Sequence, residues 1–155
     1  MKGLYRGFCR NENGTETIVL NGEKIKGEWV SGFLATECHI IDNTDSFTYF
    51  GGGGMDGFAK LIIPETVCEA VRGVTDINGK QLFEGDIIED NYSTWEVKYN
   101  CEHSGFGAYI FNVEQREINE ELMKRFEVIG TIFDEGFEEG VENYKFRKKL
   151  GRLKI

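Results

Sequence analysis

The stretch from Ile63 to Ile88 constrains the fold of this chain most strongly, because it holds two tight turns close together. Asn78-Gly79 is the strongest two-residue hairpin signal, since both central residues of a type I′ turn need a positive φ. Glu84-Gly85-Asp86 forms a second turn signal, in which Gly85 is free to adopt a left-handed conformation. Asp86 is expected to accept hydrogen bonds from nearby backbone N–H groups. Two turns so close together bend a sheet sharply, as a small closed barrel requires.

Short apolar and aromatic segments alternate with turn signals along the rest of the chain, which is typical of barrels and sandwiches. An Asn21-Gly22 turn is expected to follow the strand at 17–20. One short helix is expected from Asn119 to Arg125, with Asn119 as its N-cap, acidic residues in its first turn, and Lys124 and Arg125 in its last. The expected strands cover residues 4–9, 17–20, 29–35, 39–41, 47–50, 58–63, 67–71, 94–99, 108–113 and 128–133.

The central stretch also carries a family resemblance. Its residues read Pro64-Glu65-Thr66-Val67, then Gly73, then Asp76-x-Asn78-Gly79-Lys80-x-x-Phe83-Glu84-Gly85-Asp86-Ile87, which resembles the signature of the YopX family of phage and prophage proteins. Residues 28–34 and 126–133 resemble flanking strands of that family, whereas Cys68 stands where its members often have glycine. The resemblance implies an all-β fold of two small β subdomains, the second an SH3-like barrel, with at most short helices. It implies no catalytic residues.

The expected organisation is an N-terminal β subdomain over residues 1–63, the signature and barrel over 64–135, and a tail over 136–155. The division near Pro64 falls where one run of strands ends and the signature begins. The 155 residues suffice for one domain or two very small ones. No stretch approaches ~18 consecutive apolar residues, and residues 1–10 do not read as a signal peptide. We therefore expect no membrane partner and a location in the cytoplasm of a bacterial host cell.

Several residue groups resemble reactive sites only superficially. Gly51-Gly52-Gly53-Gly54 lacks the Gly-Lys-Ser/Thr of a phosphate-binding loop, so a hairpin tip is the simpler interpretation. Cys101-Glu102-His103 holds a thiol, an acid and an imidazole, but sequence neighbours rarely provide catalytic geometry. His39, beside Ile40 and Ile41, is read as a strand residue. The cysteines at 9, 38, 68 and 101 form no Cys-x-x-Cys pair, so free and mostly buried thiols are expected.

Acidic residues are plentiful, but the spacing of Glu84, Asp86, Glu89 and Asp90 does not require a divalent-metal site. These residues are interpreted as parts of turns and strand edges. The sequence therefore predicts no cofactor, no metal and no catalytic residue, and the protein is not expected to be an enzyme.

The last residues of the chain separate charge unusually. Residues 143–155 hold six cations and no acid, so the chain has net charge −9 with them and −15 without them, at 12 basic and 27 acidic residues. Phe146, Leu150 and Leu153 are spaced as one face of a helix. One interpretation is a solvated, frayed tail. The other is an arm that docks on an acidic surface, most simply that of a neighbouring subunit.

Three classes of function remain open. The leading one is a non-enzymatic binding or assembly module that contacts itself, as a homo-oligomer, or a host or phage protein. The second is a nucleic-acid-associated protein, which would bind only through the basic tail, or an acidic DNA mimic that inhibits a host DNA-binding protein. The third is an enzyme with an unrecognised site. The candidate interaction residues are Trp95, Tyr99, Lys145, Phe146, Arg147, Lys148, Lys149 and Arg152, and the structural motif residues are Asn78, Gly79, Gly85 and Asp86.

Overall fold

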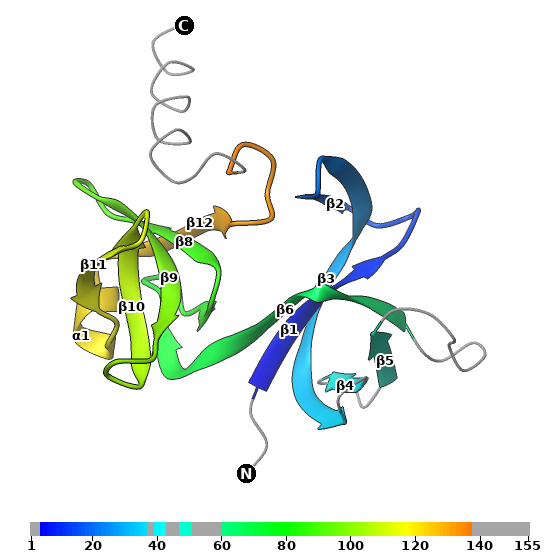
Figure 1. Ribbon diagram of the computed structural model, residues 1–155, viewed down its shortest axis with the longest axis horizontal. Helices are drawn as coiled ribbons and strands as arrows, with labels where there is room; N and C mark the ends of the chain where they lie inside the picture. The colour runs from blue at the N-terminus through cyan, green and yellow to red at the C-terminus, as the bar shows by residue number, and fades with distance from the viewer. Residues whose placement is uncertain (1–3, 37–38, 43–46, 51–59, 138–155) are drawn as a thin grey trace, which may run out of the picture. The chain divides into compact units, whose positions relative to one another are not determined.

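The structure, a computed structural model, describes residues 4–36, 39–42, 47–50 and 60–137 (Figure 1). The chain divides into two compact units, Met1–Ala70 and Val71–Ile155. Strands make up nearly all the regular structure of the described residues, and α1 (Glu120–Met123) is their one helix. The all-β prediction is therefore confirmed. In this described part, α1 is too short and too polar to cross a membrane.

The first unit is one sheet built around the long strand β3. Its strands are β1 (Leu4–Arg10), β2 (Glu16–Leu20), β3 (Glu23–Thr36), β4 (His39–Asp42), β5 (Phe47–Phe50) and the first part of β6 (Lys60–Thr75). Antiparallel pairs join β1 to β3, β2 to β3, β3 to β4 and β4 to β5, whereas β5 runs parallel to β6 and β1 pairs antiparallel with β6.

The turn between β2 and β3 has the conformation that its sequence predicts. Leu20 pairs with Glu23, so Asn21 and Gly22 are the two loop residues, and their φ angles are 52° and 81°. Positive φ at both central positions is the requirement of a type I′ turn, whose twist matches that of the flanking strands. This loop fixes the register of the β2–β3 hairpin.

The signature residues Pro64–Val67 form a bulge in β6. Phe8 pairs with Ile63 and Arg6 pairs with Cys68, so β6 has more residues than β1 between these two pairs. Thr66 is fully buried there, and its hydroxyl accepts a hydrogen bond from the Phe8 N–H at 2.8 Å and donates one to the Ile63 carbonyl at 2.6 Å. The hydroxyl therefore satisfies a backbone donor that the bulge takes out of the ladder.

The strand does not end at Pro64, where the sequence places the boundary between the β parts. β6 continues to Thr75, and the division between the two units lies between Ala70 and Val71. A proline is tolerated within a strand at a bulge because its missing N–H is not needed for the ladder there.

The second unit contains a five-stranded antiparallel sheet in the order β11-β10-β9-β8-β12. Side chains from one face of the sheet pack with residues of β6, β7 and α1 into a core that includes Leu82, Val97, Met123 and Phe126, each 0% exposed. The remaining elements are β7 (Gln81–Phe83), β8 (Asp86–Glu89), β9 (Thr94–Asn100), β10 (Gly105–Ile110), β11 (Val113–Glu117) and β12 (Glu127–Thr131).

The first signature turn differs from the type I′ turn that its Asn78-Gly79 pair predicts. Gly79 has φ 81°, but Asn78 is not among the described residues with positive φ. The Gly79 N–H donates to the Asp76 carbonyl at 3.0 Å, and the Asp76 N–H donates to the Lys80 carbonyl at 2.8 Å. The loop is therefore three residues long, with a left-handed glycine at its end, which is the second common hairpin pattern.

The Asp76 side chain explains this longer loop. Its Oδ1 accepts hydrogen bonds from the backbone N–H groups of Asn78 and Lys80, both at 2.9 Å, and its Oδ2 accepts one from Val128 at 3.0 Å. The carboxylate, 5% exposed, thus closes the turn and joins it to β12. The Asp76 carboxylate therefore stabilises the three-residue loop in place of the type I′ turn that Asn78-Gly79 alone would favour.

The second signature turn has the predicted form. Gly85 has φ 85°, and the buried Asp86 carboxylate accepts a hydrogen bond from the Phe83 N–H at 2.8 Å. Both predictions, the left-handed glycine and the aspartate acceptor, are confirmed.

Two expected elements of the second unit need correction. The strand expected over residues 108–113 is divided by a turn at Phe111-Asn112, with Ile110 paired to Val113 and Phe111 at φ 54°. The expected helix is present and Asn119 caps it, through a hydrogen bond from the Leu122 N–H, but it ends at Met123. Lys124 and Arg125 therefore follow the helix instead of completing it.

Candidate functional site

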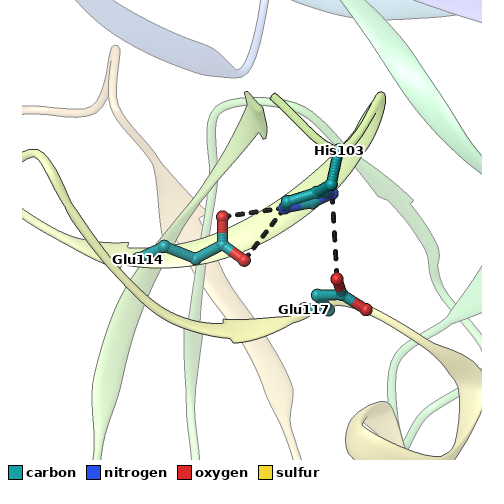
Figure 2. Close-up of side chains that lie close together, drawn as sticks. All are labelled: His103, Glu114 and Glu117. Atoms are coloured by element: carbon teal, nitrogen blue, oxygen red, sulfur yellow. Dashed lines mark hydrogen bonds and ion pairs between the residues drawn. The ribbon is translucent and has the colours of Figure 1, made fainter. Parts of the chain in front are cut away.

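Three potential metal ligands, His103, Glu114 and Glu117, converge beside the turn between β9 and β10 (Figure 2). One ligand atom from each lies within 4.8 Å of the others. His103 belongs to the four-residue loop that follows Asn100, which itself pairs with Gly105 across the hairpin. The two glutamates belong to the edge strand β11. The cluster therefore depends on the registers of two consecutive hairpins.

A β-bulge brings the two glutamates to one face of the sheet. Tyr109 of β10 pairs with Glu114, whereas its neighbour Ala108 pairs with Arg116, so β11 contains one extra residue at this point. Residues three apart on a regular strand point to opposite faces, because side chains alternate. The extra residue reverses this alternation and places Glu117 beside Glu114. Bulges commonly re-aim side chains in this way next to functional sites.

Glu114 is the centre of the hydrogen-bond network. Its Oε2 accepts hydrogen bonds from the Asn100 amide and from the Tyr109 hydroxyl, the latter at 3.1 Å. The His103 Nε2 lies 2.9 Å from Oε2 and 3.0 Å from Oε1. Within the described part of the chain, Oε1 has only the imidazole as a partner. Two donors thus hold one oxygen of the carboxylate, and the other faces the histidine.

Gly107 makes room for this carboxylate. A β-carbon built at Gly107 would lie 2.8 Å from the Glu114 Cδ, 2.9 Å from its Oε2 and 2.9 Å from the Tyr109 Cε1. These separations are shorter than van der Waals contact, so any larger residue would displace the Glu114 or Tyr109 side chain. Glycine in the interior of a strand is otherwise unfavourable. Its presence in β10 is accounted for by the close approach of Glu114.

Glu117 completes the cluster from a more exposed position. Its Oε1 lies 3.9 Å from the His103 Nδ1, and 68% of its side-chain surface is exposed, against 21% for Glu114. The two carboxylates therefore differ in rigidity of placement: Glu114 is held by three donors, and Glu117 approaches the imidazole from solvent.

The electrostatics of the cluster favour charged groups. The hydrogen bond to Glu114 raises the pKa of His103 above its ordinary value of 6.5, and the charges of both glutamates act in the same direction. The hydrogen bond from Asn100, followed by that from His103, lowers the pKa of Glu114 below 4.5. The pair consequently holds opposite charges at mildly acidic pH, when no other ligand occupies the imidazole.

The structure gives the two predicted aromatic contact residues different positions. Trp95 is 9% exposed and stacks on Phe126 with ring centroids 5.0 Å apart, so its ring serves the core of the second unit. Tyr99 is 44% exposed and packs edge to face against Phe106 at 5.3 Å. Tyr99 is therefore accessible to a partner, whereas Trp95 is not. The other predicted interaction residues lie outside the described residues: Lys145, Phe146, Arg147, Lys148, Lys149 and Arg152.

The thiol-imidazole pair considered at Cys101-Glu102-His103 does not form. Cys101 is a free, exposed thiol, and the hydrogen bonds of the His103 ring go to Glu114. Cys9 and Cys68 are buried thiols outside any disulfide, as expected for small apolar residues of a strand. The glycine run at residues 51–54 and Cys38 lie outside the described residues.

Sequence reasoning considered His103 only beside Cys101, did not predict it as a site residue, and missed both of its glutamate partners. Their proximity depends on the turn at Phe111-Asn112, which lacks glycine and lies inside the strand predicted over residues 108–113. A hairpin drawn at that point would have folded residues 113–117 back onto β10 and brought Glu114 opposite Tyr109. The bulge that adds Glu117 has no signal in the sequence.

Comparison with known proteins identifies a family. The family model described as YopX protein matches residues 9–136, which include most of the first unit, a large part of the second and every residue of the cluster. A search of curated proteins found no match.

Proposed function

The chain belongs to the YopX protein family, and we propose that it is a non-enzymatic binding module that assembles with further copies of itself. The observation that carries this proposal is the distribution of charge within the second unit, between residues 71–142 and residues 143–155. Opposite charges on separate parts of one chain favour association between chains, because each copy offers both complementary surfaces.

The charge differs strongly among three parts of the chain. Residues 1–70 carry six basic and ten acidic side chains, a net charge of −4. Residues 71–142 carry six basic and seventeen acidic side chains, a net charge of −11. Residues 143–155 carry six basic and no acidic side chains, a net charge of +6. The 71–142 part of the second unit is therefore the favoured site for the basic segment, residues 143–155, of a neighbouring copy.

Exposure of the carboxylates supports an electrostatic contact with this unit. Of its fourteen acidic residues within Val71–Phe137, six are exposed: Glu102, Glu117, Glu120, Glu121, Glu127 and Glu135. Exposed charges attract a basic partner over a distance of about 8–10 Å at moderate salt, and the attraction weakens as salt rises. The apolar residues of the segment, such as Phe146 and Leu150, would add contact area once it is bound.

Light scattering after gel filtration tests the proposal. The full chain should form an oligomer at low salt that dissociates at high salt. A full-length variant with glutamine at Lys145, Arg147, Lys148, Lys149, Arg152 and Lys154 should be monomeric at both, as should a chain ending at Glu142. A K24Q/K26Q variant, which removes positive charge from the first unit, should behave as the wild type. The same number of subunits in all four proteins would overturn the proposal.

A second candidate rests on the same charge of −11. A surface with this charge suits a basic, DNA-binding protein, which it would occupy as a DNA mimic. A full chain that is monomeric at every salt concentration, and that retains a DNA-binding host protein competed off by DNA, would favour this alternative. Binding of DNA by the chain itself would instead require the basic segment, and should be lost in the glutamine variant.

The finer expectations of the family resemblance belong to the same proposal. They are an SH3-like barrel in the second unit, an origin in a phage or prophage, and a location in the bacterial cytoplasm. The strongly curved path through the turns at Gly79 and Gly85 supports the barrel, since sharp corners between short strands are what closure requires.

A further inference from the structure

We propose that His103, Glu114 and Glu117 form a binding site for one divalent transition-metal ion of the zinc class. The site lies wholly within the described residues of the second unit and does not involve the basic segment. This inference therefore goes beyond the assembly proposed above, and either can fail while the other holds.

The distances within the cluster suit such an ion. Two ligands bound to zinc at 2.0–2.2 Å in tetrahedral geometry lie about 3.4 Å apart. The His103 Nε2 lies 3.0 Å from the Glu114 Oε1, and one ligand atom from each of the three residues lies within 4.8 Å of the others. Glu117 faces the second ring nitrogen, Nδ1, at 3.9 Å, and one ion can bind only one of the two nitrogens. An ion bound by Nε2 and the Glu114 Oε1 requires the Glu117 side chain, which is 68% exposed, to turn from Nδ1 toward Nε2, while Glu114 stays in position.

The residues around Glu114 have the arrangement of an outer ligand shell. Asn100 and Tyr109 both donate to Oε2, whereas among the described residues Oε1 has only the imidazole as a partner. Metal-binding carboxylates are commonly fixed by such donors, which orient the ligand before the ion arrives. The carboxylate is thus preorganised by groups that do not themselves bind the ion.

Two backbone features point to the same use of Glu114 and Glu117. The bulge in β11 interrupts the regular pairing of the β10–β11 ladder, and Gly107 leaves the interior of β10 without a side chain to pack. Ala108 of β10 faces the core, so its neighbours Gly107 and Tyr109 face the opposite side of the sheet, where Glu114 lies. Each of the two backbone features contributes to the convergence of three ligand side chains, one by adding Glu117 and the other by admitting Glu114.

The donor set selects the class of ion. One imidazole nitrogen with two carboxylates favours zinc, cobalt, nickel or manganese over magnesium and calcium, which prefer oxygen ligands alone. Three protein ligands leave at least one coordination position for water or for a group of a partner.

Calorimetric titration of the full chain with zinc sulfate, after treatment with a chelator, tests the proposal. Binding should saturate at one ion per chain in the cluster. H103Q and E114Q should each weaken binding at least about 10-fold, since even outer-shell changes have effects of this size. H39Q, which removes the other histidine, and E102Q, which removes an exposed carboxylate of the same loop, are matched controls and should bind as the wild type.

A second measurement separates this site from the cysteines. The cobalt-loaded chain should show the visible bands of nitrogen and oxygen ligands without a thiolate charge-transfer band, and H103Q should lose these visible bands. A thiolate band, an affinity unchanged in both H103Q and E114Q, or no binding at all would each overturn the proposal.

Discussion

Asp76 and Glu114 are two carboxylates of the same unit that each accept hydrogen bonds from three groups, yet their donors differ in kind. Asp76 accepts from the backbone N–H groups of Asn78, Lys80 and Val128 and is 5% exposed. Glu114 accepts from the side chains of Asn100, His103 and Tyr109 at the solvent-facing side of the sheet.

The difference separates a structural from a functional use of the same chemical group. Backbone donors exist in any sequence, so a buried carboxylate that satisfies three of them fixes the path of the chain. Side-chain donors must each be provided by a particular residue, and at a partly exposed position such as that of Glu114 they contribute less to folding than buried ones. A network of them around one carboxylate is better explained by the need to orient that carboxylate.

Replacement of Asp76 by alanine should have the largest effect on stability. The change leaves three backbone N–H groups without their acceptor and disconnects the signature turn from β12, and we expect the free energy of unfolding to fall by about 3 kcal/mol. Denaturant unfolding followed by tryptophan fluorescence measures this loss, because Trp95 reports on the same core.

Glu114→Gln is the matched control for this comparison. The amide keeps an oxygen acceptor at an accessible position, so the free energy of unfolding should change by no more than about 0.5 kcal/mol. Equal losses in the Asp76 and Glu114 variants would contradict the distinction between the two carboxylates.

Thr66→Val tests whether the first unit uses a buried polar group in the same structural way as Asp76. The valine is nearly isosteric but leaves the buried Phe8 N–H without an acceptor, and we expect a loss of about 2 kcal/mol. Thr66→Ser keeps the hydroxyl and should lose less. If the serine variant proved the less stable of the two, packing of the methyl group would be the dominant contribution of Thr66.

Polar groups that shape turns were easier to predict from the sequence than the cluster around Glu114. Gly85 and Asp86 were predicted correctly because a turn is local, and glycine and aspartate act on the neighbouring backbone. The turn at Asn78-Gly79 was placed correctly but given the wrong type. Its geometry depends on Asp76, whose carboxylate also binds β12, a strand about fifty residues away.

The candidate site could not be predicted because its geometry results from two registers. His103 and Glu114 meet only when β10 pairs with both of its neighbours, and Glu117 joins them only through a bulge. The turn that creates the second pairing has Phe111 at a positive φ, an uncommon conformation for a bulky residue. Trp95 was predicted as a contact residue but is buried, for a simpler reason. Strand alternation shows that Trp95, Val97 and Tyr99 share one face of β9, but it does not show that the core covers Trp95 and leaves Tyr99 exposed.

Gly107→Ala should disturb Glu114 while leaving the fold nearly unchanged. The new β-carbon would displace the ends of two flexible side chains, so we expect the free energy of unfolding to fall by less than about 1 kcal/mol. The displaced carboxylate should release the His103 ring, and the pKa of His103, measured by NMR, should fall toward 6.5. Tyr109→Phe, which removes one donor without adding bulk, should have a smaller effect on that pKa. Unaltered His103 titration in the alanine variant would show that Glu114 does not need the space at Gly107.

The smallest expected effect is the pH dependence of the His103–Glu114 pair in the metal-free chain. The imidazole faces Glu114 and Glu117 of β11, with Glu102 beside it in the loop, and its pKa is raised chiefly by the hydrogen bond to Glu114. A raised histidine pKa contributes stability that is fully present below about pH 6.5 and is lost as the pH rises through the folded value. The lowered pKa of Glu114 contributes stability that is present above about pH 4.5 and is lost as the pH falls through its own folded value. The pair should therefore stabilise the chain most between these limits. NMR titration should show a His103 midpoint above 6.5 in the wild type and a return toward 6.5 in E114Q, with H39Q used to assign the signal. A midpoint that E114Q leaves unchanged would mean that the carboxylate does not organise the imidazole, and the contrast with Asp76 would then rest on burial alone.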